Sequence, residues 1–376
     1  MAHPRPSSLL PELGFYVLAG AAADTRALVD EVAEAEQLGI GAAFASERFV
    51  AKEAATVCGA VGAVSEQIGI ATAVTNPHTR TPLTLAGHAT TMQSLTGGRY
   101  ALGLGRGIEL VLAGLGLHTL TTAEFEDHAT LLRRLTSGEI ITDHRGPAGS
   151  WPYLALQPPP LMPTPLLITA FGPRSLRLAA RAFDAVVLHT FFTDETTRRC
   201  VETVREECER IGRDPAEVRI WSCYATICTD DMPQDVVLRK TVGRLAGYMQ
   251  AYAEPLARAN GWSEAPIAAF RESEVVKSIQ GPIDANGTSD QLQAIGEILP
   301  AEWLAAAAVG SAAECARQVD RQFDLGVDGV IMHGVSPAEL RPVVDQYRSI
   351  RREHLHEGLV ANPGGTRNAA DHAGVE

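Results

Sequence analysis

The segment 97–107 is the most informative part of the chain, because its residue types and spacing suggest ligand chemistry. It reads as a turn, a short apolar strand buried on both faces, and a glycine-rich exit that carries one arginine. Alternating glycines at a strand's end let the backbone bend sharply or approach a ligand closely. Arg106, followed by Gly107, offers a permanently charged guanidinium that suits phosphate or carboxylate. A tight corner with a solvated arginine is the alternative.

A second candidate site is the segment 169–175, which joins a predicted strand to a predicted helix. Pro173 suits a first helical turn, so free N–H groups at the helix start would attract phosphate. A plain helix start with a solvent-facing arginine is the alternative, but together with Arg106 on a neighbouring strand the phosphate site is favoured. The candidate residues are Thr169, Ala170, Phe171, Gly172, Arg174 and Ser175.

The segment 71–78 is a third candidate, because small residues end a strand and polar ones follow. Small side chains such as those before Val74 and Thr75 would let a flat ring lie against the end of the strand. Asn76 could hydrogen-bond the edge of such a ring. A strand leading into a proline turn explains the same residues.

Glu47 and Arg48 follow a short buried strand and are the candidate catalytic pair. Glu47 could carry a proton if burial raises its pKa toward neutrality. Arg48 could instead pair with Glu47 and hold the carboxylate ionised, or the two could form an exposed ion pair of little energetic value. If Glu47 is not the acid–base group, His78, His189 and Glu109 are the next candidates.

Strands and helices alternate along the chain, which predicts a parallel sheet, and eight strands are enough to close it into a (β/α)8 TIM barrel. A doubly wound open sheet is the competing architecture. In a barrel, functional residues lie at the C-terminal ends of the strands, where all three candidate segments fall. The predicted strands are 13–19, 40–45, 68–75, 100–105, 165–170, 185–189, 218–228 and 328–333.

Helix signals support this alternation. Thr81 caps a helix over 82–95 that begins with proline, and Thr121 with Glu124 forms a capping-box pattern, as Ser311 does with Glu314. We expect one barrel domain over residues 1–358, with a loop insertion at about 137–163, a mostly helical insertion at about 232–305, and a disordered tail over 359–376. The insertions would cover the pocket with aromatic residues, namely Trp151, Tyr153, Tyr248 and Tyr252.

Composition excludes several classes of partner. The net charge of −13 argues against nucleic acid, and no apolar run reaches the length of a membrane span. The apolar run after residue 13 loosely mimics a signal peptide, but a first strand explains it better. The six cysteines form no C-x-x-C pair, which indicates reduced thiols of a cytoplasmic protein and no metal site. The glycines 103, 105 and 107 do not complete a dinucleotide fingerprint, because Ile108 stands where the third glycine would be.

The three candidate segments, in this order, resemble the luciferase-like flavin and deazaflavin oxidoreductase superfamily. The resemblance runs from about residue 13 to 350 and is strongest over 68–107. It implies a (β/α)8 barrel, usually dimeric, that binds coenzyme F420 or FMN at its C-terminal mouth. It also implies a non-proline cis peptide at Ala73–Val74. The implied phosphate contacts are Arg106, Gly172, Arg174 and Ser175, and the implied ring contacts are Val74, Thr75 and Asn76.

One departure from the family pattern concerns the catalytic pair. Many deazaflavin-dependent members carry an acid–histidine pair after the second strand, where this chain has Glu47–Arg48. Arginine is a poor general base because it stays protonated. The expected activity is hydride transfer between F420 and a small organic substrate, in a homodimer. An FMN-dependent monooxygenase and a non-catalytic flavin-binding relative are the alternatives.

Overall fold

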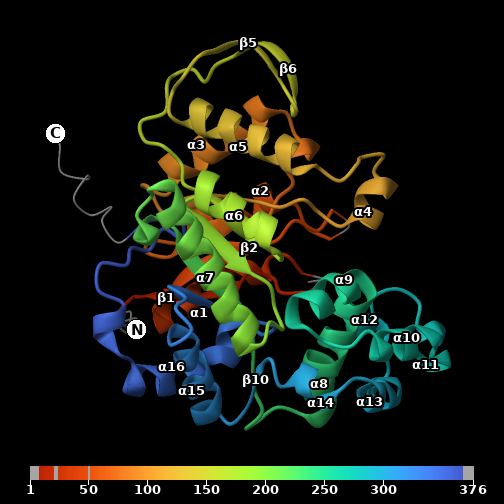
Figure 1. Cartoon of the computed structure of the whole chain (residues 1–376). Coiled ribbons are helices and arrows are strands. Elements are labelled where there is room, and N and C mark those ends of the chain that lie inside the picture. Colours follow the sequence, from red (N-terminus) through yellow and green to blue (C-terminus); the bar gives the residue numbers. More distant parts are fainter. Residues whose placement is uncertain (1–7, 21–23, 50, 367–376) are drawn as a thin grey trace.

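The computed structural model describes residues 8–20, 24–49 and 51–366, and its centre is a closed barrel of parallel strands (Figure 1). Each strand pairs in parallel with its neighbours, and pairing between the sixth and seventh barrel strands, β8 and β9, closes the ring. The predicted (β/α)8 barrel is therefore confirmed. The barrel strands are β1 (Leu10–Tyr16), β2 (Ile40–Ala45), β3 (Gly69–Thr72), β4 (Tyr100–Leu104), β7 (Leu166–Ala170), β8 (Ala185–Leu188), β9 (Arg219–Cys228) and β11 (Gly329–His333).

The helices between these strands begin where the sequence places capping residues. The Thr81 hydroxyl accepts a hydrogen bond from the Thr84 amide at the start of α3, and the predicted capping box of Thr121 with Glu124 is present. Gly39 ends α1 in the left-handed conformation, at φ 70°. The helices that surround the barrel are α1 (Ala27–Leu38), α2 (Ala54–Val64), α3 (Pro82–Leu95), α5 (Thr122–Thr136), α6 (Pro173–Ala182), α7 (Asp194–Ile211), α15 (Ala312–Phe323) and α16 (Pro337–Ile350).

The first strand begins three residues before its predicted start, because a buried carboxylate interrupts the apolar pattern. Glu12 is fully buried in β1, and its side chain accepts hydrogen bonds from Arg351 Nε at 2.6 Å and from the Tyr347 hydroxyl at 3.2 Å. A buried charge is tolerated when it is paired in this way. The partners lie more than 300 residues away, so no local pattern could have revealed the strand start.

Small side chains fill most of the barrel interior around one large ring. Trp221 from β9 is fully buried and meets Phe44 edge-on, with ring centroids 5.0 Å apart. Alanines from β2, β3, β4 and β8 complete this inner cluster. A separate and larger apolar layer lies between the strands and the surrounding helices. The lower part of the barrel is thus a packed core, as is usual for barrels of this kind.

The two insertions lie on different sides of the barrel (Figure 1). Residues 137–163, predicted as a loop, contain an antiparallel hairpin of β5 (Ile141–Gly146) and β6 (Gly149–Leu154) beside α3 and α5. Residues 232–305, predicted as a mostly helical insertion, contain a series of helices. These helices are α8 (Gln234–Leu238), the π-helix η3 (Arg239–Gly243), α9 (Arg244–Asn260), α10 (Ala265–Glu272), α11 (Glu274–Ser278), α12 (Ile283–Asn286), α13 (Ser289–Ile298) and α14 (Ala301–Leu304).

The ninth strand of the main sheet follows the helical insertion. This strand, β10 (Ala308–Gly310), pairs in parallel with Thr226, Ile227 and Cys228 at the end of β9. β9 is ten residues long and extends beyond the barrel, so its last residues have room for this extra partner.

The prediction of a disordered tail from residue 359 is wrong for residues 359–366, which seal the opposite end of the barrel. The Arg219 guanidinium donates to the Asn362 carbonyl, and the Trp221 indole N–H donates to the Pro363 carbonyl at 2.8 Å. A Cβ on Gly69 would lie 1.8 Å from the Ala361 oxygen. Arg219 and Gly69 begin their strands, so this segment covers the N-terminal ends of the barrel strands. Residues 367–376 lie outside the described part of the chain.

The helices of the described residues include none that is both long and apolar enough to cross a membrane.

The Asn362 side chain gives a direct test of this seal. Its amide donates to the carbonyls of Gly98 and Tyr100 at 2.7 and 2.8 Å, and both distances indicate good hydrogen bonds. Asn362→Ala should lower the free energy of unfolding by roughly 1–3 kcal/mol, measured by urea denaturation, because two backbone acceptors lose their partner. Asn286→Ala is the control, at an exposed asparagine whose amide donates to the carbonyl of the exposed Gln280, and it should lower that free energy by less because water can replace the lost partner. Equal effects of both substitutions would contradict a sealing role.

Candidate functional site

The end of β3 and the exit from β4 meet at the barrel mouth. The peptide bond Ala73–Val74 is cis, at the position that the family resemblance implies. A Cβ on Gly105 would lie 2.2 Å from Val74 Cγ2 and 3.3 Å from Thr169 Oγ1. Glycine at 105 therefore allows three neighbouring strand ends to come together. Val74 and Thr169 are both half-buried, so each presents part of its side chain to the mouth.

Thr75 and Asn76, predicted to contact a ring, are buried and hold the backbone of the mouth. The Asn76 side-chain amide donates to the Gly105 carbonyl at 2.9 Å. The Thr75 hydroxyl donates to Glu47 Oε2 at 2.8 Å. Gly107 takes φ 81°, with its Cβ position 2.9 Å from Asn76 Nδ2. These contacts explain why polar residues and glycines occupy the strand ends, and they leave the ring-contact role of Thr75 and Asn76 a prediction.

Glu47 is anchored on all sides. Its side chain is 1% exposed; Oε1 accepts from the Ala54 amide at 3.0 Å, and Oε2 accepts from the Thr75 hydroxyl and from Arg80 Nη2 at 3.0 Å. Its ion-pair partner is therefore Arg80, which also pairs with Glu53, and not Arg48. The exposed Glu47–Arg48 pair considered from the sequence is wrong. The carboxylate ties the end of β2 to the end of β3 and to the start of α2.

Arg48 and Lys52 lie beside this anchor at the mouth. Their backbones pair with each other, and the Arg48 side chain is exposed. Lys52 is buried and donates from Nζ to the carbonyls of Val17 and Leu18 at 2.8 and 2.6 Å. Burial, and then the charge of Arg48, lowers the pKa of Lys52 to about 8. Of these two residues, only Arg48 therefore presents its charge to solvent.

Arg106, predicted to bind phosphate, is held by the loop before α5. Its guanidinium donates to the Leu120 carbonyl at 2.7 Å and to the Thr122 hydroxyl at 3.0 Å, and lies 5.4 Å from the centre of the Phe125 ring. Burial lowers its pKa, although arginine stays protonated under ordinary conditions. These contacts give Arg106 a structural role, and its phosphate role stays a prediction.

The N-terminus of α6 is the candidate site with open space in front of it. A Cβ on Gly172, the N-cap residue, would meet nothing within 4 Å, and no side chain caps the helix. Arg174 is exposed and Ser175 is half-exposed. A ten-residue helix whose first turn faces solvent can offer its N–H groups and its dipole to an anion. Of the predicted phosphate residues, Gly172, Arg174 and Ser175 are therefore placed as expected.

An aromatic cluster stands between the ends of β7 and β8 and the helical insertion. The rings of Phe171 and His189 are 3.9 Å apart, and both lie within 5.6 Å of Tyr252 from α9. Tyr248 meets His189 edge-on at 4.9 Å. The expectation that Tyr248 and Tyr252 help to cover the mouth agrees with this arrangement. Burial lowers the pKa of His189 to about 4, so its ring is neutral near pH 7.

The hairpin aromatics do not take part in this cover. Trp151 packs against His144 and His128 on the hairpin side, with centroid distances of 5.6 and 6.5 Å. The Tyr153 side chain, on the same strand, is exposed. Their predicted role over the pocket is wrong, because residues 137–163 fold back on α5 as a hairpin.

His333, at the end of β11, is the second histidine of the mouth. Its ring meets Tyr16 edge-on at 5.2 Å, and its Nδ1 is buried without a hydrogen-bond partner among the described residues. Burial, and then the positive charges of Arg244 and Arg48, lower its pKa well below the ordinary value. Arg244 itself lies 3.5 Å from Asp284, within the insertion. Two neutral imidazoles thus line a mouth whose nearest charges are cationic.

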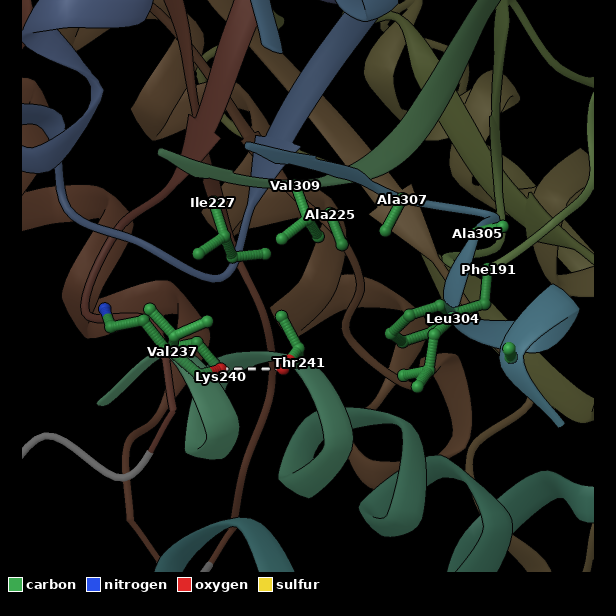
Figure 2. Close-up of a pocket in the computed structure, with 11 residues that line it drawn as sticks. Phe191, Ala225, Ile227, Val237, Lys240, Thr241, Leu304, Ala305, Ala307 and Val309 are labelled. Carbon is green, nitrogen blue, oxygen red and sulfur yellow. Dashed lines mark hydrogen bonds between the residues drawn. The ribbon is translucent and has the colours of Figure 1, made fainter. Parts of the chain in front are cut away.

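A cavity lies under the helical insertion, and Figure 2 shows it in close-up. Its volume is about 310 Å³. Side chains from β9, β10 and the loop after β8 form one wall, and side chains from α8, η3 and the region of α14 form the other.

Sequence reasoning named His189 only as a reserve acid–base candidate, and it did not name His333 as a candidate. It missed Tyr16, Cys223 and Arg244 altogether. Tyr16 and Cys223 lie in apolar strands, where a single polar group gives no signal, and Arg244 lies in a helix whose position over the barrel no periodicity fixes. The described residues contain no group of histidine, cysteine, aspartate and glutamate side chains able to hold a metal ion.

Comparison with known proteins finds relatives along nearly the whole barrel. An F420-dependent glucose-6-phosphate dehydrogenase of Intrasporangium calvum is 24% identical over 339 residues, which cover 86% of this chain and 92% of the relative. A 5,10-methylenetetrahydromethanopterin reductase of Methanolobus tindarius is 24% identical over 197 residues, 51% of this chain and 59% of the relative. The solved structure of a coenzyme F420 dependent tetrahydromethanopterin reductase of Methanopyrus kandleri superposes with a TM-score of 0.75 at 15% identity, covering 92% of this chain and 99% of that one.

The family model described as luciferase-like monooxygenase matches residues 8–329, which include all eight barrel strands except the last four residues of β11. The cis peptide, the glycine-rich exit from β4 and the open start of α6 all lie inside this match. The chain belongs to the luciferase-like monooxygenase family.

Proposed function

We propose that this protein is an oxidoreductase that transfers hydride between coenzyme F420 and a small organic substrate at the barrel mouth. The observation that carries the proposal is the open N-terminus of α6 beside a mouth lined by cations and neutral imidazoles. A relative named as F420-dependent, at 24% identity, supports the choice of the deazaflavin.

The residues present fit such a cofactor. Arg174, Ser175 and the first turn of α6 would hold a phosphate group, since Gly172 leaves the approach open. Val74, packed on Gly105, would offer an apolar surface to a flat ring. When bound, the cofactor would supply the ring atom that accepts or donates hydride. Arg48, exposed at the mouth, would add positive charge for an anionic group.

The two histidines would handle the substrate's oxygen. His189 Nδ1 faces the Thr190 carbonyl at 2.9 Å, so this nitrogen carries the proton and Nε2 keeps its lone pair. A neutral imidazole in this state accepts a hydrogen bond from a hydroxyl. Three donors, from Ala54, Thr75 and Arg80, already bond to the Glu47 carboxylate. We therefore give Glu47 a positioning role and leave its catalytic role to experiment.

An FMN-dependent monooxygenase is the second candidate, because the family takes its name from that activity and the α6 site would hold the phosphate of either cofactor. A relative that binds flavin without turnover would share the same site.

A titration tests the cofactor. The purified protein should quench F420 fluorescence at lower concentration than FMN fluorescence, which gives a smaller Kd for F420. Arg174→Ala should raise that Kd by roughly one to two orders of magnitude, because a hydrogen bond to a charged group is worth about 1.5–3 kcal/mol. Arg177→Ala, an exposed arginine one turn along α6, is the matched control. Equal or tighter binding of FMN would favour the monooxygenase.

The Glu47 anchor predicts a loss of stability. Glu47→Gln should lower the free energy of unfolding by roughly 2–3 kcal/mol, because the amide cannot serve three donors and leaves Arg80 undercompensated. Glu66→Gln, at an exposed glutamate, should change it by less than about 0.5 kcal/mol. Wild-type stability combined with a large fall in turnover would instead support Glu47 as the acid–base residue.

The buried His189 predicts a pH dependence. Its folded pKa of about 4 lies below the ordinary value of 6.5, so the unfolded chain binds more protons between these values and stability falls as the pH drops through that window. This residue alone should contribute about 2 kcal/mol of loss between pH 7 and pH 5, measured by urea denaturation. His189→Gln should remove that part of the loss, whereas His354→Gln, at an exposed histidine, should keep it.

A further inference from the structure

The cavity under the helical insertion has an almost wholly aliphatic lining. Eight of its eleven lining residues are alanine, valine, leucine or isoleucine, and Phe191 adds an aromatic ring. Its volume of about 310 Å³ lies at the lower end of the range for small-molecule sites. This partly open apolar space has the size for a small ligand and is too small for a folded protein segment.

The two polar residues that line the cavity have partners of their own. Lys240 Nζ lies 2.8 Å from Glu339 Oε1 in an ion pair, and also 3.4 Å from the Gly334 carbonyl. The Thr241 hydroxyl donates to the Val237 carbonyl at 2.7 Å, the contact drawn in Figure 2. Both groups thus have partners within the protein, and the Lys240 charge is compensated by Glu339. The lining therefore favours hydrocarbon over a sugar or an anion.

Two residues that line the cavity, Ala225 and Phe191, lie next to residues of the mouth. Side chains alternate along a strand, so Ala225 and Ile227 continue the inward face of β9 above Cys223, which lies in the barrel interior. Ala225 is paired in register with His333 on the adjacent strand β11. On the other side, Phe191 meets Tyr248 at 5.7 Å, and Tyr248 contacts His189. An elongated ligand in the cavity would thus have one end beside the imidazoles.

We propose that this cavity binds the aliphatic chain of an uncharged ketone or secondary alcohol, with the oxygen of that compound hydrogen-bonded to the His333 imidazole. The inference rests on the proposed function, since a carbon bearing such an oxygen is the kind that donates or accepts hydride. It adds the substrate class. The aliphatic lining and the limited volume favour a short hydrocarbon chain, and the neutral His333 imidazole favours an uncharged oxygen at one end of that chain.

The test is binding of 2-alkanones to the full-length protein without cofactor, followed by ligand-observed NMR. From 2-butanone to 2-octanone, affinity should rise roughly threefold to fourfold for each added methylene, because each buried CH₂ contributes a similar free energy. Ala225→Leu should abolish this rise, since its larger side chain fills the cavity. Ala268→Leu, at an exposed alanine of α10, is the matched control and should keep it.

His333→Phe tests the polar end. It should weaken 2-hexanone binding by roughly threefold to tenfold, as expected for one neutral hydrogen bond, and leave hexane binding unchanged. A thermal melt that matches wild type shows that the variant is folded. An equal loss for ketone and alkane would overturn the role given to His333.

The outcomes separate this proposal from the cofactor proposal. Affinity that does not depend on chain length, or a rise that persists in Ala225→Leu, would show a dry packing void and overturn the substrate class. That result would leave F420 binding untouched. Conversely, chain-length-dependent binding in a protein that does not bind F420 would support the cavity and defeat only the cofactor.

Discussion

The packing of small side chains around Trp221 is the constraint on which the barrel depends. The indole meets Phe44 edge-on, lies under the Arg219 guanidinium at 4.4 Å, and leaves no room for a Cβ at Gly329, which would come within 2.4 Å of it. Because one ring takes this volume, neighbouring strands contribute alanine to the interior. The indole N–H would be unsatisfied in such a core, and the Pro363 carbonyl accepts its hydrogen bond. Closure of the barrel's lower end therefore directs ligand binding to the mouth.

Electrostatics at the mouth follow from how each charge is compensated. Glu47 forms an ion pair with Arg80, and Lys52 donates hydrogen bonds to the backbone carbonyls of Val17 and Leu18. Among the described residues, neither histidine forms an ion pair with a carboxylate, so desolvation dominates and keeps both rings neutral. A chain with a net charge of −13 nevertheless exposes two cations, Arg48 and Arg174, near its mouth. Such local positive charge favours an anionic ligand even in an acidic protein.

Local patterns predicted the barrel well because its helices and strands are specified by nearby residues. The α3 helix begins and ends where Thr81, Pro82 and Leu95 predict, and β2 has its predicted bounds. The site was predicted less well, since the direction in which a side chain points depends on partners that are distant in the sequence. Arg106 has the right residue type for phosphate but is held by Leu120 and Thr122. Burial of residues 359–366 depends on Arg219 and Trp221, more than 130 residues earlier, so their Gly- and Asn-rich composition misled the prediction.

Because residues 359–366 cover the lower end of the barrel, that end can carry an attachment without obstructing the mouth. Residues 359–366 run beneath the first residues of β3 and β9, opposite the mouth. An affinity tag, a fluorophore or a surface linker joined after residue 366 would therefore emerge on the side away from bound ligands. The protein can be immobilised through its C-terminal side with the mouth facing solution, an orientation that suits biosensor measurements and electrode-coupled assays.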